Sequence, residues 1–509
     1  MRSIGIAIVA ATTMVLGLTT GSTMAAAQEH NFWQVGFPVH PTEQGSSGAA
    51  LLNEDHQVVG TLFGGISACN NLYDESDSTP GGWDLFGKFS VAWEDGLSEH
   101  MGGKLYAESD EPVSAPSIKI RKKNKGELPV RNVVSPGLML KLAADPAHTI
   151  VVDAEAIAEA KARFAAESAD PSAAKRKMVG THIDLKPMSA GIWQRLTAKD
   201  GTKSWRVAIR AEGAAFLRPH FVGEVAGEAL VYDAADAPFG RKVAKPKSAK
   251  DDADFWGPIV KGDTLFFEII TDSDTPPAIR IDKISYGVVD MMGGEGGPSG
   301  SPEGFTPKAA GTCHEDASCE SSVDEDELNA VGQMFFSVGS SDFVCTGTLM
   351  NDVGTTQTPW FLTANHCIST EASAKSLVVT WEFHTNTCNG TPPDWRFSPF
   401  TEGATLIDTG AAGSSSDFTL LRLDSDPADD VDVTFMGFTT KSISATEDLL
   451  VLHHPQGEYL RASQGIPLGE SDPSGTDIEP IGDSDDDDDD AVSVGGDDDD
   501  DDAGCGCGA

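Results

Sequence analysis

The segment Trp360-Phe361-Leu362-Thr363-Ala364-Asn365-His366-Cys367 decides the fold that we expect for this chain. It begins with aromatic, apolar and β-branched residues, as a buried strand does, and it runs into a histidine followed at once by a cysteine. Other runs of similar composition, separated by turn residues, lie at 333–338, 377–383 and 418–423. Short strands at this spacing, with hardly any helix between them, predict a β-barrel or a β-sandwich.

Two other segments supply residues that complement His366 chemically. The segment SSDF at 415–418 has Asp417 at the entry to an apolar strand, and the segment GSSG at 45–48 has two serines between glycines. A serine hydroxyl becomes a good nucleophile when a base removes its proton and a carboxylate orients that base. Each segment alone has an ordinary explanation, as a structural histidine, a turn cap or a linker, but the three together indicate nucleophilic catalysis.

The chain has 509 residues and a formal net charge of -43. This length predicts two or three folded units, and the acidic charge argues against nucleic acid or an anionic membrane as a partner. We interpret two aspartate runs, 485–490 and 497–502, as a solvated, self-repelling tail. Loose Ca²⁺ binding is the alternative for these runs, although they lack the glycine spacing of a defined calcium loop.

The N-terminus has the pattern of a secretory signal peptide. Arg2 precedes an apolar run at 4–18, and the small residues 25–27 precede Gln28, before which we expect cleavage. A buried N-terminal helix is the alternative. Export would permit disulfides among the eight cysteines. No later apolar stretch of the sequence is long enough to span a bilayer.

The rest of the chain divides by composition, and no internal repeat is found. A basic linker at 119–125 leads to an amphipathic helix that we expect at 153–166, with Asp153 as its cap. The Gly/Pro-rich stretch 292–307 is predicted to be a linker. Further strands are expected at 57–63, 89–93, 205–211, 216–222 and 264–270.

On the motifs around His366 and Asp417, the segment 313–465 resembles the catalytic domain of trypsin-like peptidases, and most closely that of the bacterial lysyl endopeptidases. It resembles the first three quarters of that domain, and then runs into acidic low complexity where the serine loop is expected. Gly482-Asp483-Ser484 is similar to the family's serine signature, but Asp485 follows where a glycine is needed, so Ser484 is rejected as the nucleophile. The other matching motifs are Cys313, Cys319, Cys345-Thr346-Gly347-Thr348-Leu349, Cys388 and His453-His454-Pro455.

The missing quarter is found at the other end of the chain. Residues 31–93 resemble the C-terminal part of the family's domain, and they carry EQGSSG (43–48), VVGTLFGG (58–65), Cys69 and DLFGK (84–88). We therefore interpret the chain as a circular permutant, in the order Ser, His, Asp. Permutation is physically tolerable when the new termini fall in an exposed loop. A rearranged gene whose product does not fold is the alternative.

The resemblance implies a role for each matching residue. Ser47 would be the nucleophile, His366 the general base and then the general acid, and Asp417 the carboxylate that orients the histidine. The backbone N–H groups of Gly45 and Ser47 would line the oxyanion hole. Ser46 stands where trypsin has an aspartate, so the usual activation ion pair with a new N-terminal amine is not available.

Asp84 matches the family's specificity carboxylate, at the base of a substrate pocket that would include Phe63, Gly64 and Gly65. A buried carboxylate there would pair with a cationic side chain, which implies cleavage after Lys, with Arg as the second candidate. A turn residue is the alternative for Asp84. Phe63 stands where lysyl endopeptidases usually carry a histidine, and their active-site tryptophan has no match, so the choice between Lys and Arg stays open.

The resemblance also implies three disulfides: Cys69–Cys313, Cys319–Cys388 and Cys345–Cys367. The first would tie the two distant peptidase segments together, and Cys505 and Cys507 would remain in the tail. Residues 109–308 resemble the propeptide region of these precursors, and Lys308 lies where a lysine-specific enzyme would cut itself free. A second cut in the linker 119–125 would leave two chains joined by a disulfide.

The expected architecture is an all-β, chymotrypsin-like double β-barrel assembled from two distant segments, with an inserted β-rich domain. The expected divisions are a signal peptide (1–27), the C-terminal part of the peptidase (28–108), a propeptide-like domain (109–308), the N-terminal part of the peptidase (309–470) and an acidic, disordered tail (471–509).

The expected function is that of a serine endopeptidase, secreted or at a bacterial cell surface, which acts as a monomer on proteins or peptides and uses no metal or cofactor. Two alternatives stay open. The chain could be a catalytically inactive secreted β protein that binds peptides or surfaces. His453 and His454 could instead hold a metal ion with the tail cysteines, although adjacent histidines rarely ligate one ion together.

Overall fold

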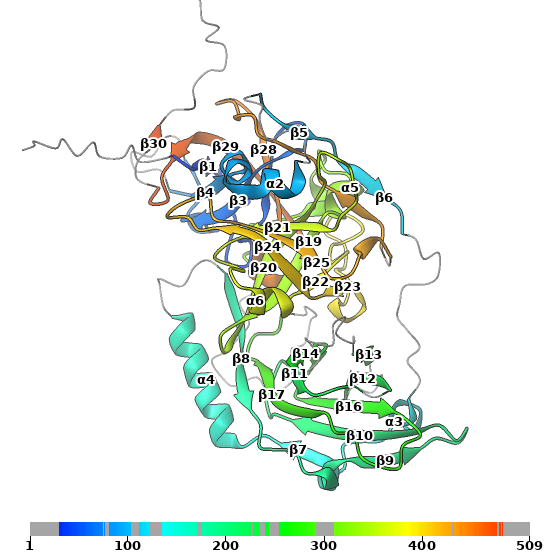
Figure 1. Ribbon diagram of the computed structural model, residues 1–509. Coiled ribbons are helices and arrows are strands. Elements are labelled where there is room, and N and C mark those ends of the chain that lie inside the picture. The colour runs from blue at the N-terminus through cyan, green and yellow to red at the C-terminus, as the bar shows by residue number, and fades with distance from the viewer. Residues whose placement is uncertain are drawn as a thin grey trace, which may run out of the picture.

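The computed structural model of the protein describes residues 30–74, 76, 81–102, 111–122, 135–169, 176–225, 227–234, 240–243, 254–291, 310–429, 431–475, 478–479 and 481. The predicted signal peptide, the linker 292–307, Ser484, both aspartate runs and the tail cysteines lie outside the described residues. Within them the chain is mostly β, which confirms the all-β fold class (Figure 1). No helix among these residues combines the length and the apolar character that a bilayer crossing needs.

The first barrel is built from both ends of the chain. Pairing runs in the order β2-β28-β29-β1-β4-β3, and an additional pairing of β3 with β2 closes the ring. We call the described residues 30–102 the front segment and 310–481 the rear segment. Val451 of the rear segment faces Leu51 of the front segment, and Ser471 of the rear segment faces Phe32 of the front segment. The six strands are β1 (Phe32–Gly36), β2 (Ala50–Leu52), β3 (Val58–Gly65), β4 (Trp83–Lys88), β28 (Leu449–His453) and β29 (Arg461–Ser471).

The second barrel comes from the rear segment alone. β22 pairs with β19, β19 with β20, β20 with β21, β21 with β25, and β25 with β24. β23, which Gly403 separates from β24, pairs back to β22 and so closes this ring. The strands are β19 (Val331–Val338), β20 (Ser341–Met350), β21 (Trp360–Ala364), β22 (Val378–Thr380), β23 (Phe400–Glu402), β24 (Ala404–Gly410) and β25 (Phe418–Leu423).

Each barrel has its own apolar core, and a shared cluster joins the two. Phe37 and Val451 lie in the core of the first barrel, and Phe361 lies in the core of the second. The joining cluster takes Phe89 from the front segment and Leu362 from the rear segment, and both are buried. Burial of this apolar surface stabilises the association of the two barrels.

The described residues 135–291, which we call the middle region, form two sheets. These sheets pack on a separate core that includes Val207, Phe221 and Phe267. One sheet contains β7 (Thr149–Val151), β9 (Gln194–Thr197), β10 (Lys203–Arg210), β12 (Glu228–Asp233), β13 (Gly240–Lys242) and β16 (Thr264–Ile270). The other contains β8 (Lys177–Asp184), β11 (Phe216–Val222), β14 (Asp254–Trp256), β15 (Val260–Lys261) and β17 (Arg280–Gly287). The helix α4 (Ala154–Ser168) packs against β8.

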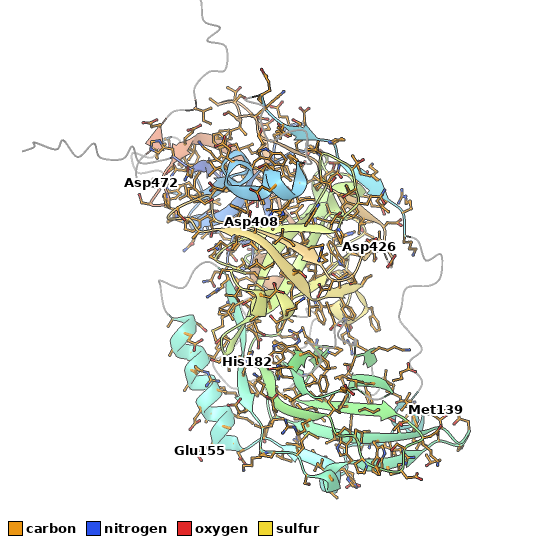
Figure 2. All side chains as sticks on the ribbon, in the orientation of Figure 1. Met139, Glu155, His182, Asp408, Asp426 and Asp472 are labelled. Atoms are coloured by element: carbon orange, nitrogen blue, oxygen red, sulfur yellow. A yellow bond between two sulfur atoms is a disulfide. The ribbon has the colours of Figure 1, made fainter. Side chains whose placement is uncertain are left out.

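The middle region is attached to the second barrel by a shared sheet. β8 pairs antiparallel with β20, so the sheet of the barrel continues into the lower half of Figure 1. His182 lies at this junction (Figure 2), where its Nε2 atom is 3.0 Å from Oδ1 of buried Asp342. The buried guanidinium of Arg218 donates to the carbonyls of Gly257 and Ser376, at 2.7 and 2.8 Å. Backbone pairing and buried polar contacts therefore hold the two parts together.

Short elements complete the described chain. They are α1 (Phe89–Ala92), the π-helix η1 (Trp93–Leu97), α2 (Ser98–Met101), β5 (Ser114–Ala115), β6 (Ile118–Ile120), α3 (Pro136–Leu140), β18 (Glu315–Asp316), α5 (Glu325–Leu328), α6 (Glu371–Lys375), β26 (Val433–Phe435), β27 (Phe438–Thr439) and β30 (Ile478–Glu479). Single 3₁₀ turns lie at Pro146–His148, Ala190–Ile192, Ala317–Cys319, Trp395–Phe397, Pro427–Asp429 and Pro455–Gly457.

The prediction of a strand at 89–93 is wrong, because these residues form α1 and the start of η1. Phe89, Trp93, Leu97 and Met101 recur every four residues and are all buried, which is the pattern of one helix face. Their aromatic and apolar composition favoured a strand, but the spacing favours a helix. The strand predicted at 377–383 is shorter, since β22 ends at Thr380.

The other expected elements agree closely with the structure. Strands predicted at 216–222, 264–270 and 418–423 are β11, β16 and β25, with the same bounds. The predicted helix is α4, and Asp153 is its N-cap by position. Its side chain makes no cap hydrogen bond and pairs with Lys186 instead, 2.6 Å away.

All three implied disulfides are present: Cys69–Cys313, Cys319–Cys388 and Cys345–Cys367. The Cys69–Cys313 bridge joins residues 244 apart in sequence, one on the loop after β3 and the other just before β18. It therefore ties the front segment to the rear segment covalently, in addition to the strand pairing of the first barrel.

Replacing Cys69 and Cys313 together with serine should lower the free energy of unfolding by roughly 2–5 kcal/mol, because the unfolded chain regains the entropy of a long loop. Replacing Cys319 and Cys388 is the matched control, since their sequence separation is 69. The loop-entropy term then predicts a smaller loss, by about 1 kcal/mol. Urea unfolding of both double variants measures the difference, and an equal or larger loss in the control contradicts this account.

Candidate active site

Asp417 and His366 meet because their strands are neighbours. β21 ends just before His366, β25 begins just after Asp417, and Ala364 pairs with Phe418 in the antiparallel ladder between them. The His366 Nδ1 atom lies 2.6 Å from Asp417 Oδ2, and the His366 backbone N–H donates to Oδ1 at 3.1 Å. A carboxylate accepts only, so Nδ1 carries the proton and Nε2 keeps its lone pair for another group.

Ser47 comes from the front segment and lies against the second barrel. Its carbonyl accepts a hydrogen bond of 2.9 Å from the backbone N–H of Thr346, and the sulfur of Cys367 is 3.7 Å from the same oxygen. Gly48 follows at φ 83°, and a Cβ there would collide with Thr363 and Thr346. Only glycine lets the serine loop approach β20 and β21 this closely, so Ser47 sits next to the residue that follows His366.

The hydrogen bond that we expected between Ser47 and His366 is not formed. Both the Ser47 Oγ atom and the His366 Nε2 atom are buried, and neither has a hydrogen-bond partner among the described residues. Hydrogen bonds between catalytic groups are often long before substrate binds, so this geometry leaves the predicted roles open. The middle region also reaches this place, since Arg176 Nη1 donates to the carbonyl of His366 at 2.7 Å.

The peptide groups that carry the two predicted oxyanion donors are both held by their carbonyls. The carbonyl of Gln44 accepts from the backbone N–H of Gln456 at 2.6 Å, and the carbonyl of Ser46 accepts from that of Ala49 at 3.0 Å. In a trans peptide the N–H points opposite to the C=O. The N–H groups of Gly45 and Ser47 are therefore turned away from these partners, and no acceptor contacts either of them within the described part of the chain.

Asp84 is a fully buried carboxylate at the start of β4. Its Oδ2 atom accepts from the hydroxyl of Thr42 at 2.5 Å and from that of Ser67, and Oδ1 accepts from the Ser67 backbone N–H at 3.3 Å. Gly65 faces Asp84 across the ladder between β3 and β4, and a Cβ on it would collide with the carboxylate. These contacts fix the orientation of the Asp84 carboxyl group in a polar setting.

Phe63 and Gly64 lie on the same strand, next to the histidine. The Phe63 ring stands edge-on to the ring of His366, with centroids 5.9 Å apart, and its other aromatic neighbour is Phe32 at 5.4 Å. Gly64 has φ 128°, which a residue with a side chain rarely adopts. Of the predicted pocket residues on β3, Phe63 therefore lies against His366.

Sequence reasoning missed a group of buried residues that lies beneath the Ser47 loop. The hydroxyl of Thr346 donates to the carbonyl of Gly45 at 3.0 Å and accepts from the backbone N–H of His454 at 3.0 Å. His453 lies 2.6 Å from Ser46 Oγ through Nδ1 and 2.8 Å from Ser463 Oγ through Nε2. The motif HHP at 453–455 was the available signal, but it indicated only a match to the family and, as an alternative, a metal site.

The hydrogen bonds of His453 disfavour it as a metal ligand, because a ligand nitrogen needs a free lone pair and both of its ring nitrogens are taken by Ser46 and Ser463. Nδ1 of His454 lies 2.8 Å from the carbonyl of Glu458, and its buried Nε2 atom has no hydrogen-bond partner among the described residues. The tail cysteines of the metal hypothesis lie outside those residues. Burial lowers the pKa of His454 to about 4 and that of His453 well below its usual value, so both rings are neutral near pH 7.

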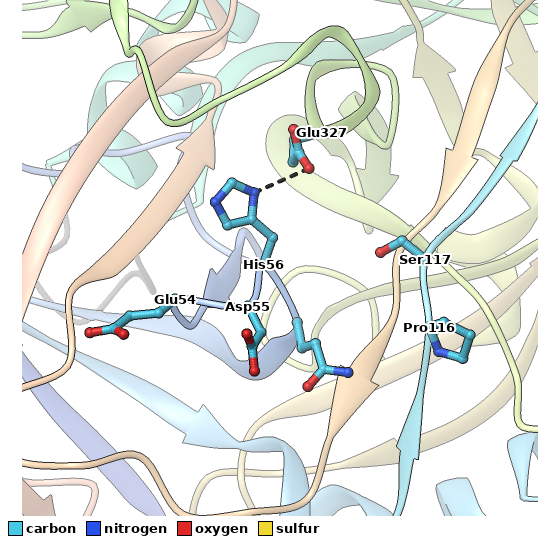
Figure 3. Close-up of a pocket in the computed structure, with 7 residues that line it drawn as sticks. Glu54, Asp55, His56, Pro116, Ser117 and Glu327 are labelled. Carbon is cyan, nitrogen blue, oxygen red and sulfur yellow. Dashed lines mark ion pairs between the residues drawn. The ribbon is translucent and has the colours of Figure 1, made fainter.

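A separate hollow of about 490 Å³ contains none of the predicted site residues. Its lining includes Glu54, Asp55 and Ser117, and an ion pair of 3.1 Å joins His56 to Glu327 across it (Figure 3). Burial raises the pKa of Glu327. This ion pair is one more contact between the front and rear segments.

Comparison with known proteins gives a family and a relative. The family model described as "Lysyl endopeptidase, C-terminal domain" matches residues 10–79 and 307–483. These two blocks contain Ser47, His366 and Asp417, whereas Asp84 lies outside them. A protein of Pseudomonas aeruginosa named lysyl endopeptidase is 27% identical over 306 residues, which cover 57% of this chain and 62% of the relative. The match thus spans less than two thirds of that relative's length.

The buried histidines predict acid sensitivity. An unfolded histidine titrates near pH 6.5, and His454 in the folded chain near about 4. The unfolded state therefore binds more protons between these values, so stability falls as the pH drops from 6.5 to 4. For His454 the loss is on the order of 3 kcal/mol.

Urea unfolding at pH 7 and pH 4 measures this loss, with His454→Asn as the matched variant because its amide can still donate to Glu458. Carboxylates also titrate in this range, so the difference between parent and variant is the decisive quantity. The parent should lose more stability than the variant on acidification. Equal losses in both proteins contradict the assignment.

Proposed function

Since this chain is a lysyl endopeptidase-like protein, we propose that it is a secreted serine endopeptidase that hydrolyses peptide bonds after lysine. The observation that carries the proposal is the closure of one barrel from two distant segments. This closure brings Ser47 of the front segment against the strands that present His366 and Asp417.

In the proposed mechanism Ser47 Oγ attacks the scissile carbonyl carbon while His366 Nε2 takes the hydroxyl proton. Asp417 holds the ring in the required tautomer and stabilises the imidazolium that forms. The N–H groups of Gly45 and Ser47 donate to the developing oxyanion. His366 then protonates the leaving amine. Water attacks the acyl-enzyme carbonyl carbon while His366 takes its proton, and His366 returns that proton to Ser47 Oγ as the acid product leaves. All these groups are supplied by the chain itself.

Specificity is assigned to Asp84, with Phe63, Gly64 and Gly65 beside it. A carboxylate held by Thr42 and Ser67 at the base of a pocket favours the ammonium of a lysine side chain. Arginine is the second candidate, because Phe63 offers no hydrogen-bonding group that would select the compact ammonium.

The order of the segments in the chain belongs to the same proposal. We infer a circular permutant of the family's catalytic domain, in which residues 109–308 act as an inserted propeptide-like domain. The proposal has three further parts. The N-terminal signal directs secretion, the protein acts as a monomer on proteins or peptides, and the inserted region is removed by cleavage after Lys308. The ladder between β6 and β26 protects Lys119, so the second cut is expected closer to Lys125.

An inactive, peptide-binding relative of such enzymes is the second candidate. One observation favours it: the Ser47 hydroxyl and the His366 ring make no hydrogen bond to each other, while Arg176 of the middle region contacts the His366 carbonyl. Activity of the parent chain separates the two candidates.

The triad is tested with Ser47→Ala. This change should lower kcat/KM for a lysine ester at least about a thousandfold, because the nucleophile is lost while binding remains. Ser484→Ala is the matched control, since Ser484 belongs to the rejected serine signature, and it should leave hydrolysis unchanged. Hydrolysis that survives Ser47→Ala, or that is lost in Ser484→Ala, contradicts the assignment.

The pocket is tested with Asp84→Asn, which keeps the shape of the side chain and removes its charge. We expect kcat/KM for a lysine substrate to fall by roughly 10²–10⁴, since a desolvated ammonium loses its counter-charge. Hydrolysis of a matched norleucine substrate should change far less. A parallel loss for both substrates would point to a structural role for Asp84.

A further inference from the structure

A continuous chain of hydrogen bonds runs beneath Ser47 and links both segments of the barrel. The backbone N–H of Glu43 donates to Ser46 Oγ at 3.2 Å, and this oxygen lies 2.6 Å from His453 Nδ1. His453 Nε2 lies 2.8 Å from Ser463 Oγ, which donates to the carbonyl of Pro41 at 3.3 Å. Ser46, His453 and Ser463 are all buried.

The two ends of this chain determine its direction. The carbonyl of Pro41 only accepts, so the Ser463 hydroxyl donates to it and must accept from Nε2–H of His453. Nδ1 of His453 is then unprotonated and accepts the hydroxyl proton of Ser46. One lone pair of Ser46 Oγ receives the Glu43 N–H. Every proton along the chain therefore has an acceptor when His453 is neutral.

The groups around His453 disfavour its protonation. Complete burial is the main reason that its pKa is lowered, and charge interactions with His314, His454 and Arg461 lower it further. The His314 ring stands edge-on to it, with centroids 5.7 Å apart. The Glu43 carboxylate pairs with His314, at 3.4 Å, and no ion pair joins a carboxylate to His453 among the described residues. A protonated His453 would present N–H to the hydroxyl of Ser46, which would then have no acceptor for its own proton.

Ser46 connects this chain to the predicted oxyanion hole. Its backbone N–H donates to the carbonyl of Glu43 at 3.0 Å, and its carbonyl accepts from Ala49, which orients the peptide that carries the Ser47 N–H. The side-chain bond to His453 adds a third attachment, and it anchors this turn to β28, a strand of the other segment. Loss of that bond frees the Ser46 side chain inside the turn that carries the nucleophile.

We propose that His453, acting through Ser46, is the positioning residue of the loop 43–48, which carries the predicted oxyanion donors and which we call the oxyanion loop. It holds this loop in the conformation that catalysis needs in the uncut chain. His453 touches neither substrate nor the reacting atoms. The role rests on the proposed peptidase function, because only a reaction with an oxyanion needs the loop in one shape. All members of the hydrogen-bond chain lie within the polypeptide, so the loop needs no new amine from cleavage.

The test compares Ser46→Ala with Ser46→Thr, which retains a hydroxyl. We expect Ser46→Ala to lower kcat for a lysine ester by roughly 10–10³, up to the effect of losing one oxyanion donor, with KM unchanged. Affinity for a lysine aldehyde, which forms a tetrahedral adduct, should fall in parallel. Affinity for an alkylamine that fills only the Asp84 pocket should stay the same, and Ser46→Thr should restore most of kcat.

Two results would overturn the proposal. The first is an unchanged kcat in Ser46→Ala. The second is a Ser46→Ala variant that loses affinity for the alkylamine as strongly as for the aldehyde and also has a lower melting temperature, which would indicate general disruption of the fold. His453→Gln provides a second variant: its amide can replace one of the two hydrogen bonds but not both, so it should resemble Ser46→Ala in kcat.

A spectroscopic measurement separates this inference from the proposed function. In ¹⁵N-histidine-labelled protein, the signal absent from His453→Gln should have the shifts of a neutral Nε2–H tautomer at pH 7, and Ser46→Ala should move its Nδ1 resonance. An inactive parent with this signature refutes the peptidase and leaves the hydrogen-bond chain standing. A charged ring or the opposite tautomer refutes the hydrogen-bond chain, whether or not the parent is active.

Discussion

The structure depends on the pairing of β1 with β29 and of β2 with β28, strands from opposite ends of the chain. Without these two ladders the first barrel is an open sheet of four front strands, and the Ser47 loop loses the closed frame that holds it against the second barrel. With them, the serine loop rests on Thr346 of the second barrel, in which β21 and β25 already hold His366 beside Asp417, and the bridge between Cys69 and Cys313 joins two parts that already touch. Barrel closure also removes the unpaired edges that an open sheet would expose.

Much of the fold could be predicted from the sequence where local pattern and tertiary role coincide. Phe418 to Leu423 is apolar and bounded by turn residues, and it is a buried strand with those bounds. The disulfides came from resemblance rather than from spacing, since three pairings among distant cysteines cannot be derived from one sequence. The helix at Phe89 was missed because its composition was weighed above the spacing of its buried residues.

The candidate site also has a part that the sequence predicts and a part that it does not. Short motifs with recognisable chemistry contain Ser47, His366, Asp417 and Asp84, although the roles of these residues stay predictions. His453 was not predictable as a loop support, because Ser46 lies in the turn before β2 and Ser463 lies on β29, and only the barrel brings them together. The missing hydrogen bond between Ser47 and His366 was equally out of reach. It depends on side-chain rotation rather than on residue type.

Barrel closure also has a consequence for how the protein is made. The front strands leave the ribosome first, and β2 ends at Leu52 whereas its partner β28 begins at Leu449. At roughly 5–20 residues per second, the edges of β1 and β2 wait on the order of 20–80 s for the rear strands. During that interval they are open templates for strands of neighbouring chains. This architecture is therefore most vulnerable to aggregation while the chain is being synthesised in a crowded cell. The vulnerability comes from the unpaired edges at that stage and not from weak native contacts.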